Sequence, residues 1–187
     1  MSIPVSVLFA RRDSIYKQLP SVDVWDEDRD ARNWPGGTPV VAHPPCAGYC
    51  RLRAFANEDA ERDSHAIWAV EQVRKFGGVL EHPYLSTLWK LDDLKLPVPG
   101  EFDQWDGYTV AMPQFWFGFP AMKATWFYIV GCRPSNLPPV PLRLGKPEVI
   151  VSTTASGNSR EMKKSERTVT VRPLAEWLVD VARRTAA

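Results

Sequence analysis

The sequence predicts an α/β fold with a Rossmann-like, open and mostly parallel sheet that carries helices on both faces. Short apolar runs rich in β-branched residues alternate with segments of helical periodicity along most of the chain. Parallel strands need crossover connections, and helices make the most compact ones, so this alternation favours a parallel sheet covered on both sides. A length of 187 residues is ordinary for one domain, and we expect residues 1–187 to form a single domain.

Five segments have the composition of buried strands, with Val, Leu, Ile or aromatic residues in short runs. These expected strands cover residues 4–10, 22–25, 38–43, 79–82 and 124–131. The turn signal Trp-Pro-Gly-Gly introduces the third strand, and a cluster of acidic residues follows the second. Together with the helical segments between them, these strands make up the alternation on which the α/β prediction depends.

The clearest helix is expected to begin at an Asn57 cap and to end at Gly77 and Gly78. Acidic residues open this helix, and apolar residues recur at helical spacing as far as Phe76. A C-terminal amphipathic helix and two shorter helical segments are also expected, at residues 173–185, 14–19 and 85–94. An exposed connection is expected at residues 145–168, which are rich in Gly, Ser, Thr and Lys.

Composition narrows the class of protein. Lys and Arg total 23 against 22 Asp and Glu, so no overall field favours nucleic acid or a membrane surface, and only a local basic patch stays open. Three cysteines are too few for a disulfide framework and indicate a reducing compartment, so a cytoplasmic location is expected. No apolar run approaches the roughly 20 residues of a membrane span, and the chain opens without a leader pattern, so no membrane partner is expected.

Two reactive side chains follow neighbouring expected strands. Cys46 comes just after the strand that ends in Val-Val-Ala-His, and Glu81 ends the strand Val-Leu-Glu-His. Ligands of open parallel sheets bind beyond the carboxyl ends of the strands, where the loops diverge. A cysteine nucleophile and a carboxyl group that carries or accepts a proton form a plausible catalytic pair at this edge.

A zinc site is an alternative interpretation of the same segment. Cys46 and Cys50 are separated by three residues, and two histidines, His43 and His82, belong to the same region. The chain offers no second clean cysteine pair, so no metal is expected. Cys50 and Cys132 are interpreted as core or incidental cysteines.

Three motifs resemble those of cytosine-C5 DNA methyltransferases. The sequence His-Pro-Pro-Cys after a buried strand resembles the Pro-Cys loop of that family, and Leu-Glu-His-Pro resembles its Glu-Asn-Val segment. The stretch Lys-Ala-Thr-Trp-Phe-Tyr-Ile-Val-Gly resembles the basic stretch that runs into a later strand. The order and spacing are similar to those of small phage-type methyltransferase-like proteins without a target-recognition domain. The resemblance covers most of the chain and implies a methyltransferase-like fold.

The resemblance also implies a mechanism and a substrate. A base is flipped out of DNA, Cys46 adds to C6 of the pyrimidine, and Glu81 binds N3, so that C5 can attack an electrophile. Transferase activity, DNA binding and DNA modification are therefore expected. Five residues expected to contact the substrate flank these two along the sequence: His43, Pro45, Arg51, Arg53 and His82. Lys123 and Thr125, from the later basic stretch, complete the expected set.

The expected cofactor region departs from the family pattern. A methyl donor needs a glycine-rich turn after the first strand, whereas this sequence has Leu-Phe-Ala-Arg-Arg-Asp-Ser there. S-adenosylmethionine is kept as a possible cofactor, but the missing glycines disfavour it. The residues expected to line this region are Phe9, Arg11, Arg12, Asp26 and Asp30.

Two further alternatives stay open. The chain leaves about forty residues before its last helix, which is too short for a target-recognition domain, so a protein partner is a possible source of specificity, or a pyrimidine nucleotide is the substrate. The second interpretation is a non-catalytic nucleic-acid-binding protein that keeps the fold and has lost the donor site.

Overall fold

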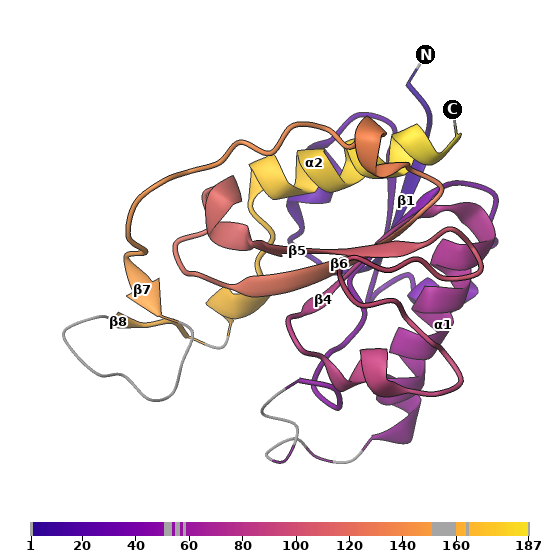
Figure 1. Ribbon diagram of the computed structural model, residues 1–187, viewed down its shortest axis with the longest axis horizontal. Coiled ribbons are helices and arrows are strands. Elements are labelled where there is room, and N and C mark those ends of the chain that lie inside the picture. Colours follow the sequence, from indigo (N-terminus) through magenta and orange to yellow (C-terminus); the bar gives the residue numbers. More distant parts are fainter. Residues whose placement is uncertain are drawn as a thin grey trace.

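A computed structural model describes residues 2–50, 54, 57, 59–150, 160–163 and 165–186, and it contains a mixed sheet of six strands (Figure 1). The strand order is β2-β1-β3-β4-β6-β5. The first four strands in this order run parallel, whereas β6 is antiparallel to both β4 and β5. The bounds are β1 Val5–Ala10, β2 Val22–Asp26, β3 Val40–Ala42, β4 Gly78–Pro83, β5 Tyr108–Pro113 and β6 Ala124–Val130. The predicted α/β class with a mostly parallel sheet is confirmed.

Helices cover both faces of this sheet, as Figure 1 shows. Side chains at alternate positions of a strand point to opposite faces. Val79 packs in one hydrophobic cluster with Leu178, whereas Leu80 packs in another with Val70. Val70 belongs to helix α1 and Leu178 to helix α2, whose bounds are Ala60–Phe76 and Arg172–Arg183. Each face of the sheet therefore has its own core.

The central pair of strands fixes where two chain segments emerge. Val40 pairs with Gly78, and Ala42 pairs with Leu80, so β3 and β4 run side by side in the same direction. Residues that follow β3 and residues at the end of β4 therefore meet at the same edge of the sheet. By the alternation along β4, Glu81 shares the α2 face with Val79.

The start of α1 differs from the prediction. Asp59 is the N-cap, because its carboxylate accepts a hydrogen bond from the backbone N–H of Arg62 at 2.9 Å. The prediction of Asn57 as the cap is wrong, since a nearer side chain satisfies the first turn. Gly77 ends the helix as expected, with φ of 74° and its N–H bonded to the carbonyl of Val73 at 2.9 Å.

Several other segments differ from the expected elements. The helix expected at 85–94 is reduced to a single 3₁₀ turn, η4 (Thr87–Lys90), and the segment at 14–19 contains the 3₁₀ turn η1 (Ile15–Gln18). Strand β5 is absent from the sequence-based prediction, because partly exposed positions interrupt its apolar pattern at this edge of the sheet. Its hairpin with β6 explains why this end of the sheet is antiparallel.

The segment expected to be an exposed connection contains buried residues. Val149 and Met162 are buried in a small cluster with Phe119 and Ala121. The short strands β7 (Val149–Ile150) and β8 (Arg160–Glu161) pair in parallel beside it. Elsewhere, none of the helices in the described part of the chain is long and apolar enough to cross a membrane.

Candidate active site at the carboxyl ends of β3 and β4

Glu81 is the most extensively bonded carboxylate of the candidate site. Its Oε2 lies 3.1 Å from His43 Nδ1, and its Oε1 accepts a hydrogen bond from Gln114 Nε2 at 2.8 Å and lies 3.6 Å from Lys123 Nζ. The side chain is only 13% exposed. Burial opposes ionisation, but Lys123 and the bond from His43 hold the pKa of Glu81 well below its usual range. Glu81 is therefore a carboxylate at neutral pH.

His43 connects Glu81 to a buried tyrosine. Tyr16 is 1% exposed, and its hydroxyl lies 2.9 Å from His43 Nε2. Burial, and secondly the charge of Glu81, raise the pKa of Tyr16 well above its usual value, so the hydroxyl keeps its proton. A protonated hydroxyl donates to Nε2 and leaves the Nδ1–H of His43 to donate to Glu81. No pattern in the sequence predicts Tyr16 at this site, because Tyr16 belongs to η1.

Gln114 is a further residue that sequence reasoning missed. It begins the 3₁₀ turn η5 (Gln114–Phe117) after β5, and its Nε2 donates both to Glu81 and to Thr125 Oγ1, the latter at 3.1 Å. The side chain is 1% exposed, and among the described residues its Oε1 has no hydrogen-bond partner. Reversing the amide would point an oxygen at the carboxylate, so Glu81 fixes this orientation. A polar residue before Phe-Trp-Phe was the available signal.

Lys123 and Thr125, both expected to contact the substrate, occupy different places. Lys123 precedes β6, and its side chain is 20% exposed beside Glu81. Thr125 is 1% exposed, accepts a hydrogen bond from Gln114 and donates to the backbone carbonyl of Lys123 at 3.2 Å. Lys123 is therefore placed to reach a ligand, whereas Thr125 supports Gln114 from behind.

Cys46 lies in the turn that follows β3. The backbone N–H groups of Tyr49 and Cys50 both bond to its carbonyl, at 3.0 and 2.9 Å, and its side chain is half-buried. Burial, and secondly the negative charge of Glu81, raise the pKa of the Cys46 thiol to about 11, while Lys123 acts in the opposite direction. The thiol and the carboxylate are thus close enough to influence each other. The sulfur is protonated at neutral pH in the free protein.

The turn that carries Cys46 is tied to the rest of the fold through Tyr49. Its hydroxyl donates to the backbone carbonyl of Asp63 in α1 at 3.0 Å, and its own carbonyl accepts the N–H of Thr87 at 2.9 Å. Gly48 lies against the Asp63 carboxylate, where a Cβ would approach to 2.3 Å. These contacts hold the turn in place through groups other than the Cys46 side chain.

His82 faces away from Glu81, into the core on the α1 side. It is fully buried between Tyr49 and Trp89, and its Nδ1 lies 2.8 Å from Ser86 Oγ. Burial lowers the pKa of His82 to about 4, against the opposing effects of Glu81 and of the Pro45 carbonyl. His82, expected to contact the substrate, therefore lies on the opposite face of the sheet from Glu81.

The residues expected to bind a cofactor lie near the carboxyl ends of β1 and β2, but each already has partners within the protein. Asp26 is 4% exposed and bonds to Lys17 Nζ at 2.6 Å. Arg11 pairs with Asp13 at 2.8 Å, and Arg12 pairs with Asp28 at 3.0 Å.

The last two members of this set shape the backbone. Phe9 adopts the left-handed region, with φ of 58°, and its ring stacks on His65 at 5.2 Å. Asp30 accepts the backbone N–H of Arg32 at 3.0 Å and caps the turn η2 (Ala31–Asn33). Both residues are therefore engaged in contacts within the protein.

Two further expectations concern phosphate contacts and a zinc site. Arg51 and Arg53, expected to contact phosphates, lie outside the described residues. Within the described ranges, no group of three or more His, Cys, Asp or Glu side chains is arranged to hold a metal ion. The zinc alternative built on Cys46 and Cys50 therefore has no support from the geometry.

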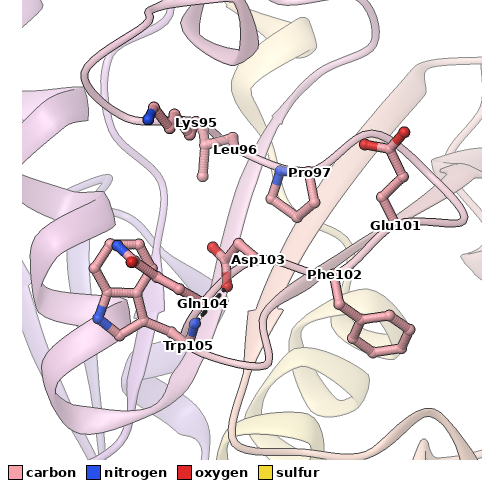
Figure 2. A pocket seen from close by; sticks show the side chains of 8 residues that line it. All are labelled: Lys95, Leu96, Pro97, Glu101, Phe102, Asp103, Gln104 and Trp105. Atoms are coloured by element: carbon pink, nitrogen blue, oxygen red, sulfur yellow. Dashed lines mark hydrogen bonds between the residues drawn. The ribbon is translucent and has the colours of Figure 1, made fainter.

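A separate pocket of about 420 Å³ lies in the connection between β4 and β5 (Figure 2). Asp103 lies at its centre and is bonded to Arg74 at 3.2 Å and to Tyr128 at 2.6 Å. The pocket is lined by Lys95, Leu96, Pro97, Glu101, Phe102, Asp103, Gln104 and Trp105. It contains none of the residues expected to act on a substrate, and the Asp103 carboxylate is occupied by its internal partners.

Comparison by sequence finds no matching protein-family model and no matching curated protein. The functional conclusion therefore depends on the chemistry of the residues around Glu81.

Glu81 and Lys123 carry opposite charges and shift the pKa of Cys46 in opposite directions, so removing either charge is expected to change the reactivity of the thiol in opposite ways. A pKa of about 11 leaves about one thiol in a thousand ionised at pH 8. Glu81→Gln removes a negative charge and is expected to increase the rate of Cys46 alkylation by iodoacetamide several-fold, whereas Lys123→Met is expected to decrease it. The measurement is the mass of the Cys46 peptide over time. Glu71→Gln, an exposed change on α1, is the control, and equal rates in the two glutamine variants would contradict the coupling.

Proposed function

We propose that the protein is a DNA base-modifying enzyme that acts on a flipped pyrimidine, with Cys46 as the nucleophile and Glu81 as the group that binds the ring edge. The observation that carries this proposal is the convergence of a half-buried thiol and a carboxylate that is only 13% exposed at the carboxyl ends of paired parallel strands. Their electrostatic coupling, with Lys123 acting on both, supports a common site.

The proposed chemistry is addition to the ring. The sulfur of Cys46 bonds to C6, the electron pair of the C5=C6 bond moves toward the substituent at C4, and the thiol proton leaves to water. Lys123, beside Glu81, is placed to stabilise the negative charge that develops on the ring. C5 of the adduct is then nucleophilic and takes either a proton or an electrophile.

The proposal assigns no role to S-adenosylmethionine. Asp26, at the position where the ribose of a donor would be held, is closed by Lys17, and Arg12 pairs with Asp28 beside it. The left-handed Phe9 supplies a sharp turn at the end of β1, but its ring fills space that a glycine would leave open. The electrophile that C5 attacks is therefore not identified with a methyl group.

A second function, nucleic-acid binding without catalysis, is favoured by one observation. The pKa of about 11 at Cys46 keeps the thiol protonated at neutral pH, whereas cysteine nucleophiles usually ionise readily. This alternative predicts binding of DNA with no bond to the base. One assay therefore separates the two functions.

The assay uses oligonucleotides that contain 5-fluoropyrimidines, single- and double-stranded, with and without S-adenosylmethionine. We expect a complex that survives a denaturing gel, that disappears in Cys46→Ser, and that persists in Cys50→Ser. Free 5-fluoropyrimidine nucleotides form a parallel arm, because reaction with them alone would move the substrate from DNA to nucleotides. DNA binding without any covalent complex would favour the non-catalytic function.

A further inference from the structure

The polar groups around Glu81 form a series of donor, acceptor and donor. Lys123 Nζ lies 3.6 Å from Oε1, and His43 Nδ1 lies 3.1 Å from Oε2 on the other side of the carboxylate. Gln114 adds a second donor to Oε1 at 2.8 Å. The groups that face Glu81 therefore donate, and the carboxylate itself accepts.

This pattern selects among pyrimidines, because their ring edges differ. Uracil and thymine present an acceptor at O4, a donor at N3–H and an acceptor at O2. Cytosine presents a donor at N4, an acceptor at N3 and an acceptor at O2. Glu81 and Tyr16 already occupy both ring nitrogens of His43, so Lys123 is the donor left for a ligand. The Glu81 carboxylate with Lys123 beside it complements N3–H and one neighbouring carbonyl of the first edge, and it places an oxygen against the bare N3 of the second. An unpaired polar group that is buried on binding costs more than the hydrogen bond it replaces.

We propose that the substrate ring is uracil or thymine rather than cytosine, with N3–H bound by Glu81 and a ring carbonyl bound by Lys123. This assignment rests on the proposed function and specifies its substrate. Three donors fill part of the acceptor capacity of Glu81, since a carboxylate has about four lone-pair positions, and one position is left for N3–H.

The donor set also suits the covalent step on such a ring. Attack of Cys46 at C6 moves the C5=C6 electron pair onto O4 and gives an enolate, while the thiol proton leaves to water. Lys123, 20% exposed and with three N–H donors, is placed to stabilise that oxygen. Without another electrophile, C5 takes a proton from water, and the product is a 5,6-dihydro thioether.

The inference is tested by two oligonucleotides that differ only in one base, 5-fluorouracil or 5-fluorocytosine. We expect the wild-type protein to form the Cys46 adduct faster with 5-fluorouracil, and this preference to fall about tenfold in Glu81→Gln, whose amide also offers a donor to N3. Comparison of the two proteins cancels the intrinsic difference in reactivity between the rings. Glu71→Gln is the control and is expected to keep the wild-type preference.

A second measurement needs no variant. Oligonucleotides with a single uracil or a single cytosine compete with iodoacetamide for Cys46 in the wild-type protein, and the uracil oligonucleotide is expected to protect at lower concentration. Equal or better protection and adduct formation with cytosine would overturn the substrate assignment and leave the proposed function standing. Absence of any adduct with either ring would overturn the proposed function as well.

Discussion

Replacing Gly78 with alanine is expected to lower the free energy of unfolding by about 4 kcal/mol, as a clash in the centre of a sheet requires. Gly78 has φ of 130°, and a Cβ there would lie 1.9 Å from the backbone oxygen of Val40 and 2.7 Å from its nitrogen. The contact is with backbone in the β3–β4 pair, so no side-chain rotation relieves it. Strand separation at this point would also displace Cys46 from Glu81.

Gly100→Ala is the matched control for Gly78→Ala. Gly100 also has a positive φ, 98°, but a Cβ there would have no atom within 4 Å. Only the conformational strain of about 1 kcal/mol is expected at this position. Urea unfolding followed by fluorescence measures both variants. Equal losses would show that the backbone contact with Val40 is unimportant, whereas failure of the Gly78 variant alone to accumulate as folded protein would agree with the prediction.

The second large effect is a loss of stability in mild acid caused by His82. Its pKa is about 4 in the folded protein, against 6.5 for an ordinary histidine. Between these values the unfolded chain binds the proton and the folded protein does not, so stability falls as the pH falls from 6.5 to 4. The full difference corresponds to about 3 kcal/mol. Burial of the neutral ring among aromatic side chains is the physical cause.

The variant His82→Gln is expected to reduce the dependence of the free energy of unfolding on pH. The slope of that free energy against pH is measured, because the substitution also lowers stability at neutral pH. His65→Gln, which changes a half-buried histidine of α1, is expected to keep the slope. The comparison is made above pH 4.5. The pKa of Glu81 is lowered from 4.5 by folding, so protonation of Glu81 reduces the stability only below this pH. An unchanged slope in His82→Gln would contradict the assignment.

The parallel half of the sheet was predictable because its strands are continuous apolar runs. Buried strands such as Val40–Ala42 leave a clear pattern in composition, and their direction follows from the helical segments between them. The edge strand β5 could not be predicted, because its partly exposed positions interrupt the run of apolar residues. Helix ends were uncertain for a local reason: Asn57 and Asp59 are both good caps, and only the geometry distinguishes them.

Part of the candidate site could be predicted because parallel strands were predicted on either side of it. Cys46 follows β3 and Glu81 lies near the end of β4, the parallel strand beside it, so the rule that ligands bind beyond strand ends places them together. Tyr16 and Gln114 join them through η1 and through the β5–β6 hairpin, which are tertiary features without a periodic signal. His82 follows Glu81 directly in the chain, and the alternation of a strand sends it to the opposite face.

The central claim is that Cys46 and Glu81 act on the same pyrimidine ring. The most direct test is peptide mapping by mass spectrometry after reaction with a 5-fluorouracil oligonucleotide. We predict that the nucleotide is attached to the peptide that carries Cys46, and that Glu81→Gln greatly reduces the modified fraction. Attachment to Cys50 or Cys132, or a modified fraction that does not depend on Glu81, would contradict the claim.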